Sequence, residues 1–219
     1  MPDAERSVLR TACLLVLVWL AVAGAVLGLG WLVTNPLEPS VDGWDDDVVL
    51  WFASERSSDL DRVADAGTLL GDTPVGMGVA AVAALVLSLW RRSVVPAVFL
   101  ALLVAGIGGF YWAATTLITR DRPPVRILDP GLVPDDSYPS GHLATALAVY
   151  GGIAVLLWVV APRARSWLWL LLLLPAVVAL ARLYQGAHHP TDELASVLYT
   201  TAWMAALVSL LLRGRVPDQ

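Results

Sequence analysis

The sequence contains no lysine and a single cysteine, Cys13, so every basic side chain apart from histidine is an arginine. One cysteine excludes an intramolecular disulfide and a metal cluster built on several thiolates. Charged residues make up only 15% of the chain, and the formal net charge is -5. Because proteins that bind nucleic acids present a basic face, this charge balance argues against a nucleic-acid partner.

Apolar residues are abundant instead, since 58% of the 219 residues are hydrophobic, more than a water-soluble domain buries. They form six runs, at about 11–33, 74–90, 94–118, 142–161, 167–187 and 194–212. Each run is near the roughly 20 residues that a helix needs to cross the hydrocarbon core of a bilayer. The sequence therefore predicts an all-α, polytopic membrane protein with six transmembrane helices in a single domain over residues 1–219.

The first apolar run follows Arg6 and Arg10 and contains small residues, as a cleaved signal peptide would. The run is about 23 residues long. The hydrophobic part of a signal peptide is shorter, roughly 7–15 residues. The length therefore favours a retained membrane helix.

Arginines flank the apolar runs in a pattern that predicts how the helices are oriented. Four pairs fall on one side of the predicted bundle: Arg6, Arg10, Arg91, Arg92, Arg163, Arg165, Arg213 and Arg215. Basic residues concentrate in cytoplasmic loops, so both termini are predicted to be cytoplasmic in a multi-pass cell-membrane protein. Segments 34–73, 119–141 and 188–193 then lie on the extracytoplasmic side.

Segment 34–73 is acidic and contains an amphipathic pattern. Apolar side chains recur there at helical spacing: Trp44, Val48, Trp51 and Phe52. They lie opposite the acidic run from Asp45 to Asp47, which predicts a short interfacial helix between the first two membrane helices. Consecutive aspartates point in different directions around a helix, so a solvated face is favoured over a metal site.

The segment 119–141 carries three arginines on the side where basic residues are uncommon: Arg120, Arg122 and Arg126. Arginines near helix ends often extend to lipid headgroups. The alternative is an anion site, because guanidinium groups match phosphate oxygens with two parallel hydrogen bonds. The arginines alone do not decide between the two.

The stretch YPSGH at residues 138–142 favours the anion site. Ser140 can cap the helix that follows, and Gly141 lets an anion approach the first free N–H groups of that helix. His142 then lies beside the bound group, where an imidazole is suited to transfer a proton. A histidine in this role requires a partner group elsewhere in the chain.

Residues 181–196 supply that partner. Arg182 falls at the end of an apolar run, where burying an unpaired charge costs roughly 2.5–3.5 kcal/mol, so it requires an anion. His188 and Asp192 follow, with Pro190 in the predicted first turn of the last helix. Their spacing predicts that the Asp192 carboxylate contacts one imidazole nitrogen of His188 and leaves the other nitrogen as a nucleophile.

These stretches resemble the signature of the type 2 phosphatidic acid phosphatase (lipid phosphate phosphatase) superfamily, integral-membrane branch. The signature has three parts: Lys-x6-Arg-Pro, Pro-Ser-Gly-His and Ser-Arg-x5-His-x3-Asp. The chain matches them in order, with catalytic segments at about 115–142 and 181–192. Two positions depart from the pattern. Thr115 replaces the usual lysine and Ala181 the usual serine, which removes a phosphate-contacting charge and a hydroxyl donor.

The resemblance implies a metal-independent phosphatase without a cofactor, acting at the extracytoplasmic face on the phosphomonoester or diphosphate of a lipid. Phosphatidic acid, phosphatidylglycerol phosphate and polyprenyl diphosphate all fit that description. It implies that His188 attacks phosphorus to give a phosphohistidine, that Asp192 orients His188, and that His142 protonates the leaving group and then activates water. The implied phosphate ligands are Arg122, Arg182, Ser140, the Gly141 amide and Arg120.

A non-catalytic binder or transporter of anionic lipids is the alternative function. It would account for the arginines but not for His142, His188 and Asp192. His189 is a second histidine in the last motif, but only His188 is separated from an aspartate by three residues. His189 is therefore expected to be an interfacial residue or a contact at the rim of the substrate site.

Overall fold

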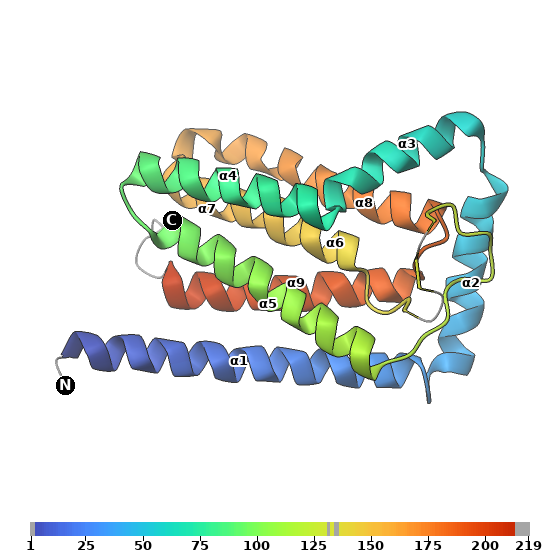
Figure 1. The fold of residues 1–219 in the computed structure, drawn as a ribbon, viewed down its shortest axis with the longest axis horizontal. Helices are drawn as coiled ribbons and strands as arrows, with labels where there is room; N and C mark the ends of the chain where they lie inside the picture. The colour runs from blue at the N-terminus through green and yellow to red at the C-terminus, as the bar shows by residue number, and fades with distance from the viewer. Residues whose placement is uncertain (1–2, 131, 134–135, 213–219) are drawn as a thin grey trace.

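Six membrane-spanning segments form the body of the protein (Figure 1). The computed structural model describes residues 3–130, 132–133 and 136–212. Within these residues, the segments long and apolar enough to span a membrane are Val8–Val33, Thr73–Arg91, Val95–Leu117, Gly141–Val160, Pro162–Tyr184 and Pro190–Leu211. No β-strand is present in the described part of the chain. The predicted all-α class and the six membrane helices are confirmed.

The spanning segments are built from the following elements. Four of them belong to single helices: α1 (Asp3–Val33), α4 (Thr73–Arg91), α5 (Val95–Leu117) and α9 (Pro190–Leu211). The fourth consists of α6 (Gly141–Ala146), the π-helical η2 (Leu147–Gly151) and α7 (Gly152–Val160). The fifth consists of the 3-10 helix η3 (Pro162–Leu172) and α8 (Leu173–Tyr184). Between α1 and α4 lie α2 (Glu38–Ser54), α3 (Ser58–Thr68) and the short η1 (Leu69–Gly71).

The two boundaries that differ most from the predicted spans each coincide with a proline. The last helix begins at Pro190 rather than at 194, because proline has no N–H to lose and its fixed φ suits the first helical position. The polar residues of that first turn interrupt the apolar run but belong to the helix. In the fifth segment, helical structure begins at Pro162 rather than at 167.

An aromatic cluster holds α1, α5 and α9 together. Phe110 of α5 stacks on Trp19 of α1 with ring centroids 5.0 Å apart. Tyr199 and Trp203 of α9 meet the same phenylalanine edge-on, at 5.6 and 6.0 Å. Aromatic pairs of this kind contribute about 0.5–1.5 kcal/mol each beyond the area they bury. The middle of the bundle therefore fixes α9, whose first turn carries candidate catalytic residues.

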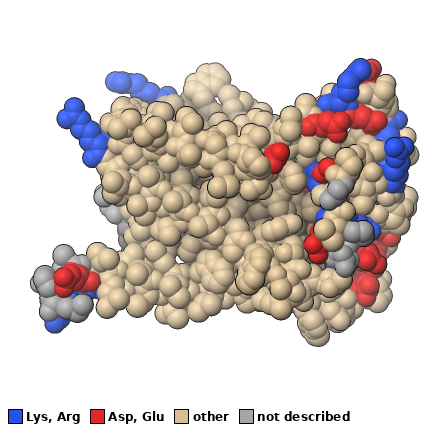
Figure 2. Space-filling view, in the orientation of Figure 1, with Lys and Arg blue, Asp and Glu red and all other residues tan. Residues whose placement is uncertain are grey.

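Charged side chains gather at the two ends of the bundle and leave an uncharged band between them (Figure 2). The start of α1, the α4–α5 turn and the end of α9 share one end, and α2 runs across the other (Figure 1). Arg91 and Arg92 of the α4–α5 turn are exposed. Arg213 and Arg215 lie outside the described residues. The structure thus places both ends of the described chain on the arginine-flanked side.

The acidic segment between α1 and α4 forms two helices where the sequence predicts one. Ser57 caps the second of them, α3, because its hydroxyl accepts the Leu60 N–H at 3.4 Å. In the turn between them, Arg56 donates from Nε and Nη2 to the Tyr184 carbonyl at 3.1 and 2.9 Å. This contact ties the α2–α3 turn to the end of α8. Helix α3 was not predicted from the sequence, because most of its residues are polar or small and form no apolar run.

Single cysteines test the predicted orientation. In a Cys13→Ser background, Ser93→Cys lies in the α4–α5 turn and Asp59→Cys in α3, where the Asp59 side chain is 84% exposed. We expect a membrane-impermeant thiol reagent to label Asp59→Cys in intact cells and to label Ser93→Cys only after lysis. Labelling of Ser93→Cys in intact cells would show that the orientation is the reverse of the predicted one.

Candidate active site

The motif residues meet at the end of the bundle that α2 crosses (Figure 1). The loop between α5 and α6, the first turn of α6 and the turn between α8 and α9 all lie there. Each of the three sequence motifs thus contributes to one region. Some of these side chains have all their hydrogen-bonding groups paired within the protein, and others keep groups that can bind a ligand.

The turn after α8 depends on a glycine. Gly186 has a φ of +70°, a left-handed conformation that favours glycine over residues with a Cβ. Its N–H bonds to the Leu183 carbonyl and that of Ala187 to the Arg182 carbonyl, both at 3.0 Å. This arrangement ends the helix and turns the chain toward α9. It thereby places His188 between Arg182 and the first turn of α9.

Arg182 is fully buried and only half paired. Its Nη1 donates to Asp129 Oδ2 at 2.7 Å and to the side-chain oxygens of Thr68 and Gln185, each at 3.0 Å. Within the described part of the chain, its Nε and Nη2 have no hydrogen-bond partner. These two nitrogens form the edge of a guanidinium group that binds an oxyanion with two parallel bonds. The buried arginine therefore offers an open anion-binding edge.

Arg122 ties the α5–α6 loop to the turn before α9. It donates from Nε to the Val133 carbonyl at 2.8 Å, from Nη1 to the Ala187 carbonyl at 2.5 Å and from Nη2 to the Asp136 carbonyl at 2.9 Å. A guanidinium group has five N–H donors, so two remain for a ligand. Burial and then the charge of Arg182 lower the pKa of Arg122, which shows that the two cations repel each other.

His188 is buried, with 4% of its surface exposed, and its Nδ1 lies 2.6 Å from the carbonyl oxygen of Ser137. A carbonyl only accepts hydrogen bonds, so Nδ1 carries the proton and Nε2 keeps its lone pair. Burial and then the positive charge of Arg182 hold the pKa of His188 well below the usual histidine value. The imidazole is therefore neutral at neutral pH, as a nucleophile must be.

The predicted contact between Asp192 and His188 is replaced by an indirect one. Asp192 Oδ2 accepts the Ser137 hydroxyl at 2.6 Å and the main-chain N–H of His189 at 2.8 Å. The carboxylate thus fixes Ser137, whose carbonyl orients His188. The reason lies in where the helix begins: with α9 starting at Pro190, Asp192 is in its first turn and caps it, whereas His188 precedes the helix.

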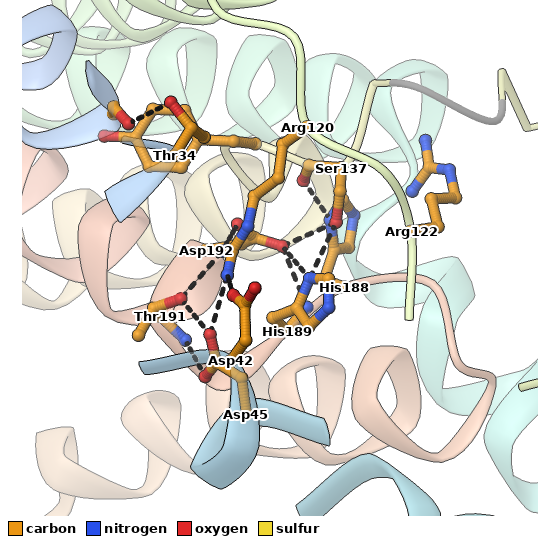
Figure 3. Close-up of polar contacts among 12 residues, drawn as sticks. Thr34, Asp42, Asp45, Arg120, Arg122, Ser137, His188, His189, Thr191 and Asp192 are labelled. Atoms are coloured by element: carbon orange, nitrogen blue, oxygen red, sulfur yellow. Dashed lines mark hydrogen bonds and ion pairs between the residues drawn. The ribbon is translucent and has the colours of Figure 1, made fainter. Parts of the chain in front are cut away.

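Unlike Arg182 and Arg122, Arg120 is held between two buried carboxylates, contrary to its predicted role as a phosphate ligand. Figure 3 shows its guanidinium group between two aspartates, with Nη1 2.5 Å from Asp192 Oδ1 and Nη2 2.8 Å from Asp45 Oδ2. Burial would lower the pKa of Arg120, but these carboxylates raise it above the usual arginine value. Arg120 is committed to carboxylates because it lies between two buried ones.

The YPSGH stretch enters α6 through Ser140, which holds the N-cap position. Its side chain makes no capping bond, and its buried hydroxyl lies close enough to the Glu193 carboxylate to interact with it. Its carbonyl accepts the Ser196 hydroxyl at 3.0 Å, which docks the start of α6 on α9. His142 is half-buried in the first turn of α6.

The two departures from the family pattern have local explanations. The Thr115 hydroxyl bonds to the carbonyls of Tyr111 and Trp112, one turn earlier in its own helix, at 3.1 and 3.3 Å. Ala181 is buried among Ala64 of α3 and Tyr184. A small apolar side chain at position 181 therefore lets α3 pack against α8.

A polar cavity of about 420 Å³ borders Arg122 and His189 and is also lined by acidic side chains, including Glu38, Asp42 and Asp46. An apolar groove of about 440 Å³ lies between α2, α3 and α8 and reaches Ala181, next to Arg182. In the described residues, no three His, Cys, Asp or Glu side chains are grouped so that they could hold a metal ion.

Sequence reasoning missed Asp45, Asp129 and Ser137. Asp45 is fully buried, which corrects the prediction that the acidic run is a solvated face; Asp47 of the same run is exposed. A signal was available for Asp45, because it lies one helical turn from the buried Val49. Asp129 and Ser137 lie in the loop, where no periodicity marks which residues turn inward.

Comparison with known proteins identifies the family to which the chain belongs. A sequence model of the PAP2 superfamily matches residues 94–215, more than half of the chain. A search of curated proteins finds no match. The chain is similar to the "crystal structure of the first transmembrane PAP2 type phosphatidylglycerolphosphate phosphatase from Bacillus subtilis", with 20% identity and a TM-score of 0.68. The alignment covers 90% of this chain and 92% of that one and shows a shared fold.

The geometry at Gly186 gives a testable expectation. A Cβ there would lie 2.5 Å from Val125 Cγ2, and the left-handed conformation costs a non-glycine residue about 1–2 kcal/mol. We expect Gly186→Ala to lower the melting temperature by at least about 2–4 °C and to reduce activity, because the turn positions His188. Gly78→Ala is the matched control, since a Cβ at Gly78 would meet no atom within 4 Å. Equal melting curves for the two variants would show that the turn tolerates a side chain.

Proposed function

Because the chain belongs to the PAP2 superfamily, we propose that this multi-pass membrane protein hydrolyses the phosphomonoester or diphosphate of a lipid through a phosphohistidine intermediate. The proposal assigns His188 as the nucleophile and His142 as the acid and base. It assigns the phosphate oxygens to Arg182, Arg122, Ser140 and the Gly141 amide. No metal ion or organic cofactor takes part in the proposed reaction.

One observation carries the proposal: the half-paired guanidinium group of the fully buried Arg182. A buried cation with two unpaired nitrogens is costly unless a ligand supplies the missing acceptors. The nearby charge of Arg122 adds repulsion that a bound anion would reduce. A phosphate group satisfies both demands, since its oxygens accept two parallel hydrogen bonds and its negative charge separates the two arginines.

The proposed first step is attack of His188 Nε2 on phosphorus. The proton on Nδ1 stays bonded to the Ser137 carbonyl, which fixes the ring while the new bond between nitrogen and phosphorus forms. The bond from phosphorus to the leaving oxygen breaks, and His142 gives that oxygen a proton. Arg182 and Arg122 stabilise the charge on the equatorial phosphate oxygens throughout.

The second step hydrolyses the intermediate. His142, now neutral, takes a proton from a water molecule that attacks phosphorus on the side the leaving group vacated. The bond to His188 breaks, and its electron pair returns to Nε2. Inorganic phosphate leaves, and the site regains its starting protonation.

Asp192 has a supporting role in this scheme. Its negative charge lies close enough to His188 to act on it, and it balances part of the imidazolium charge that forms during the reaction. Its hydrogen bond to Ser137 holds the carbonyl that selects the tautomer of His188. Arg120, which we no longer assign to the phosphate, holds Asp192 in place.

A lipid substrate is supported by an apolar groove that reaches Ala181, the residue before Arg182. The apolar groove between α2, α3 and α8 is lined by Trp51, Leu60, Val63 and Leu180 and can receive an acyl or prenyl chain. The site lies at one end of the bundle, at headgroup depth for a chain in the bilayer. With the predicted orientation, it faces the extracytoplasmic side. Phosphatidic acid, phosphatidylglycerol phosphate and polyprenyl diphosphate remain the substrate candidates.

Trapping the intermediate tests the proposal. We expect the purified protein to release phosphate from a radiolabelled lipid phosphate in the presence of EDTA, and to carry a base-stable, acid-labile label when turnover is quenched. His188→Ala should abolish both signals. His189→Ala should retain the covalent label and lose much less activity, because the His189 side chain contacts Asp46 and Asp192 rather than the proposed phosphate ligands.

The same assay rejects the proposal in two ways. Turnover by His188→Ala, or a covalent label that depends on His189 instead, would show that the nucleophile is misassigned. Absence of phosphate release from all three candidate lipids, with binding retained, would favour the non-catalytic anionic-lipid binder.

A further inference from the structure

Asp45 of α2 is fully buried, although it belongs to none of the three motifs. A buried carboxylate is stable only when it is paired, because removing its charge from water is costly. Its neighbour on the same helix, Asp47, is exposed. The burial of Asp45 therefore reflects specific partners rather than the general placement of the acidic run.

The partners of Asp45 are residues of the candidate active site (Figure 3). Its Oδ2 lies 2.8 Å from Arg120 Nη2 and accepts the hydroxyl of Thr191, and its Oδ1 accepts the main-chain N–H of Thr191 at 3.1 Å. From its other side, Arg120 donates through Nη1 to Asp192 Oδ1 at 2.5 Å and to Thr191 Oγ1 at 2.7 Å. Asp45 and Asp192 thus hold the same guanidinium group.

The bond to the Thr191 N–H has a second effect. The first N–H groups of a helix have no partner within it, and Thr191 follows Pro190 at the start of α9. Asp45 therefore caps α9 from another helix, while Asp192 caps it from within by accepting the His189 N–H. Together the two carboxylates fix the residues that immediately follow His188.

We propose that Asp45 is a positioning residue for the nucleophile, acting through Arg120 and Asp192 and through the start of α9. The chain of contacts runs from Asp45 to Arg120, to Asp192 and to Ser137, whose carbonyl orients His188. This inference rests on the proposed function of His188. It makes α2 part of the catalytic apparatus, outside the matched range 94–215.

The contacts also predict which kinetic parameter depends on Asp45. Arg182 is held by Thr68, Asp129 and Gln185, and none of these side chains belongs to the Asp45 network. Loss of Asp45 should therefore leave substrate binding nearly intact while misaligning the nucleophile. We therefore expect a lower kcat and a slower rate of phosphoenzyme formation.

Asp45→Asn is the informative substitution, because it preserves the shape of the side chain and removes its charge. We expect a decrease in kcat of at least about tenfold, with KM within about twofold of the wild-type value. Asp45→Ala, which also loses the cap on α9, should be lower still. Asp47→Asn is the matched control on the exposed face of α2 and should behave as wild type. Phosphoenzyme formation in a single turnover should slow in parallel with kcat.

Thr191→Val provides a second variant if Asp45→Asn does not fold. It removes only the hydroxyl that bonds to both Asp45 and Arg120, and we expect a smaller decrease in kcat, again with KM unchanged. In the Asp45→Asn and Arg120→Gln double variant, kcat should fall no further than in the worse single variant, because both substitutions break one chain of contacts.

The outcomes separate this inference from the proposed function. If wild type is active and His188→Ala is not, the assay is valid. Under those conditions, a kcat of Asp45→Asn equal to that of Asp47→Asn, or a rise in KM without a loss in kcat, would overturn the positioning role. The positioning role would also be overturned if the decreases in kcat of the Asp45→Asn and Arg120→Gln variants multiplied in the double variant. If wild type itself releases no phosphate, it is the proposed function that fails.

Discussion

The structure depends on the burial of one positive charge, that of Arg182, at the end of a membrane helix. An unpaired charge at the centre of a membrane helix costs roughly 2.5–3.5 kcal/mol on insertion scales. Arg182 is near a helix end but fully buried, so the surrounding chain must still compensate for its charge. Three oxygen atoms pair with Nη1, from α3, from the α5–α6 loop and from Gln185. The remaining edge stays open because the protein provides no acceptor there in the described residues. In the proposed function, the phosphate group binds at this open edge.

The other two motif arginines have different partners, which explains their separate roles. Arg122 binds main-chain carbonyls and closes the loop against the turn before α9. Arg120 binds carboxylates and links α2 to the first turn of α9. Sequence position does not distinguish these uses, since the two arginines are two residues apart. The difference arises because buried carboxylates surround Arg120, whereas Arg122 faces carbonyl oxygens and the cation of Arg182.

The membrane helices could be predicted from the sequence because bilayer thickness and apolar run length are related directly. The meeting of Arg182, His188 and Asp192 could also be expected, since Gly186 and Pro190 end one helix and begin the next within a few residues. The hydrogen-bond partner of His188 could not be predicted from the sequence. Spacing favoured Asp192, but the tertiary fold brings the Ser137 carbonyl, 51 residues away, to Nδ1. Likewise, the docking of α2 on α9 buries Asp45 and leaves Asp47 exposed.

The most direct measurement is a structure of the protein with vanadate, which mimics five-coordinate phosphorus. The account predicts vanadium bonded to His188 Nε2, with vanadate oxygens on Arg182 Nε and Nη2 and on the Ser140 hydroxyl. It also predicts that Arg120 keeps its contacts with Asp45 and Asp192. Vanadate bound instead in the polar cavity beside His189, with the Arg182 edge still open, would contradict the central claim that the half-paired arginine marks the site of phosphate chemistry.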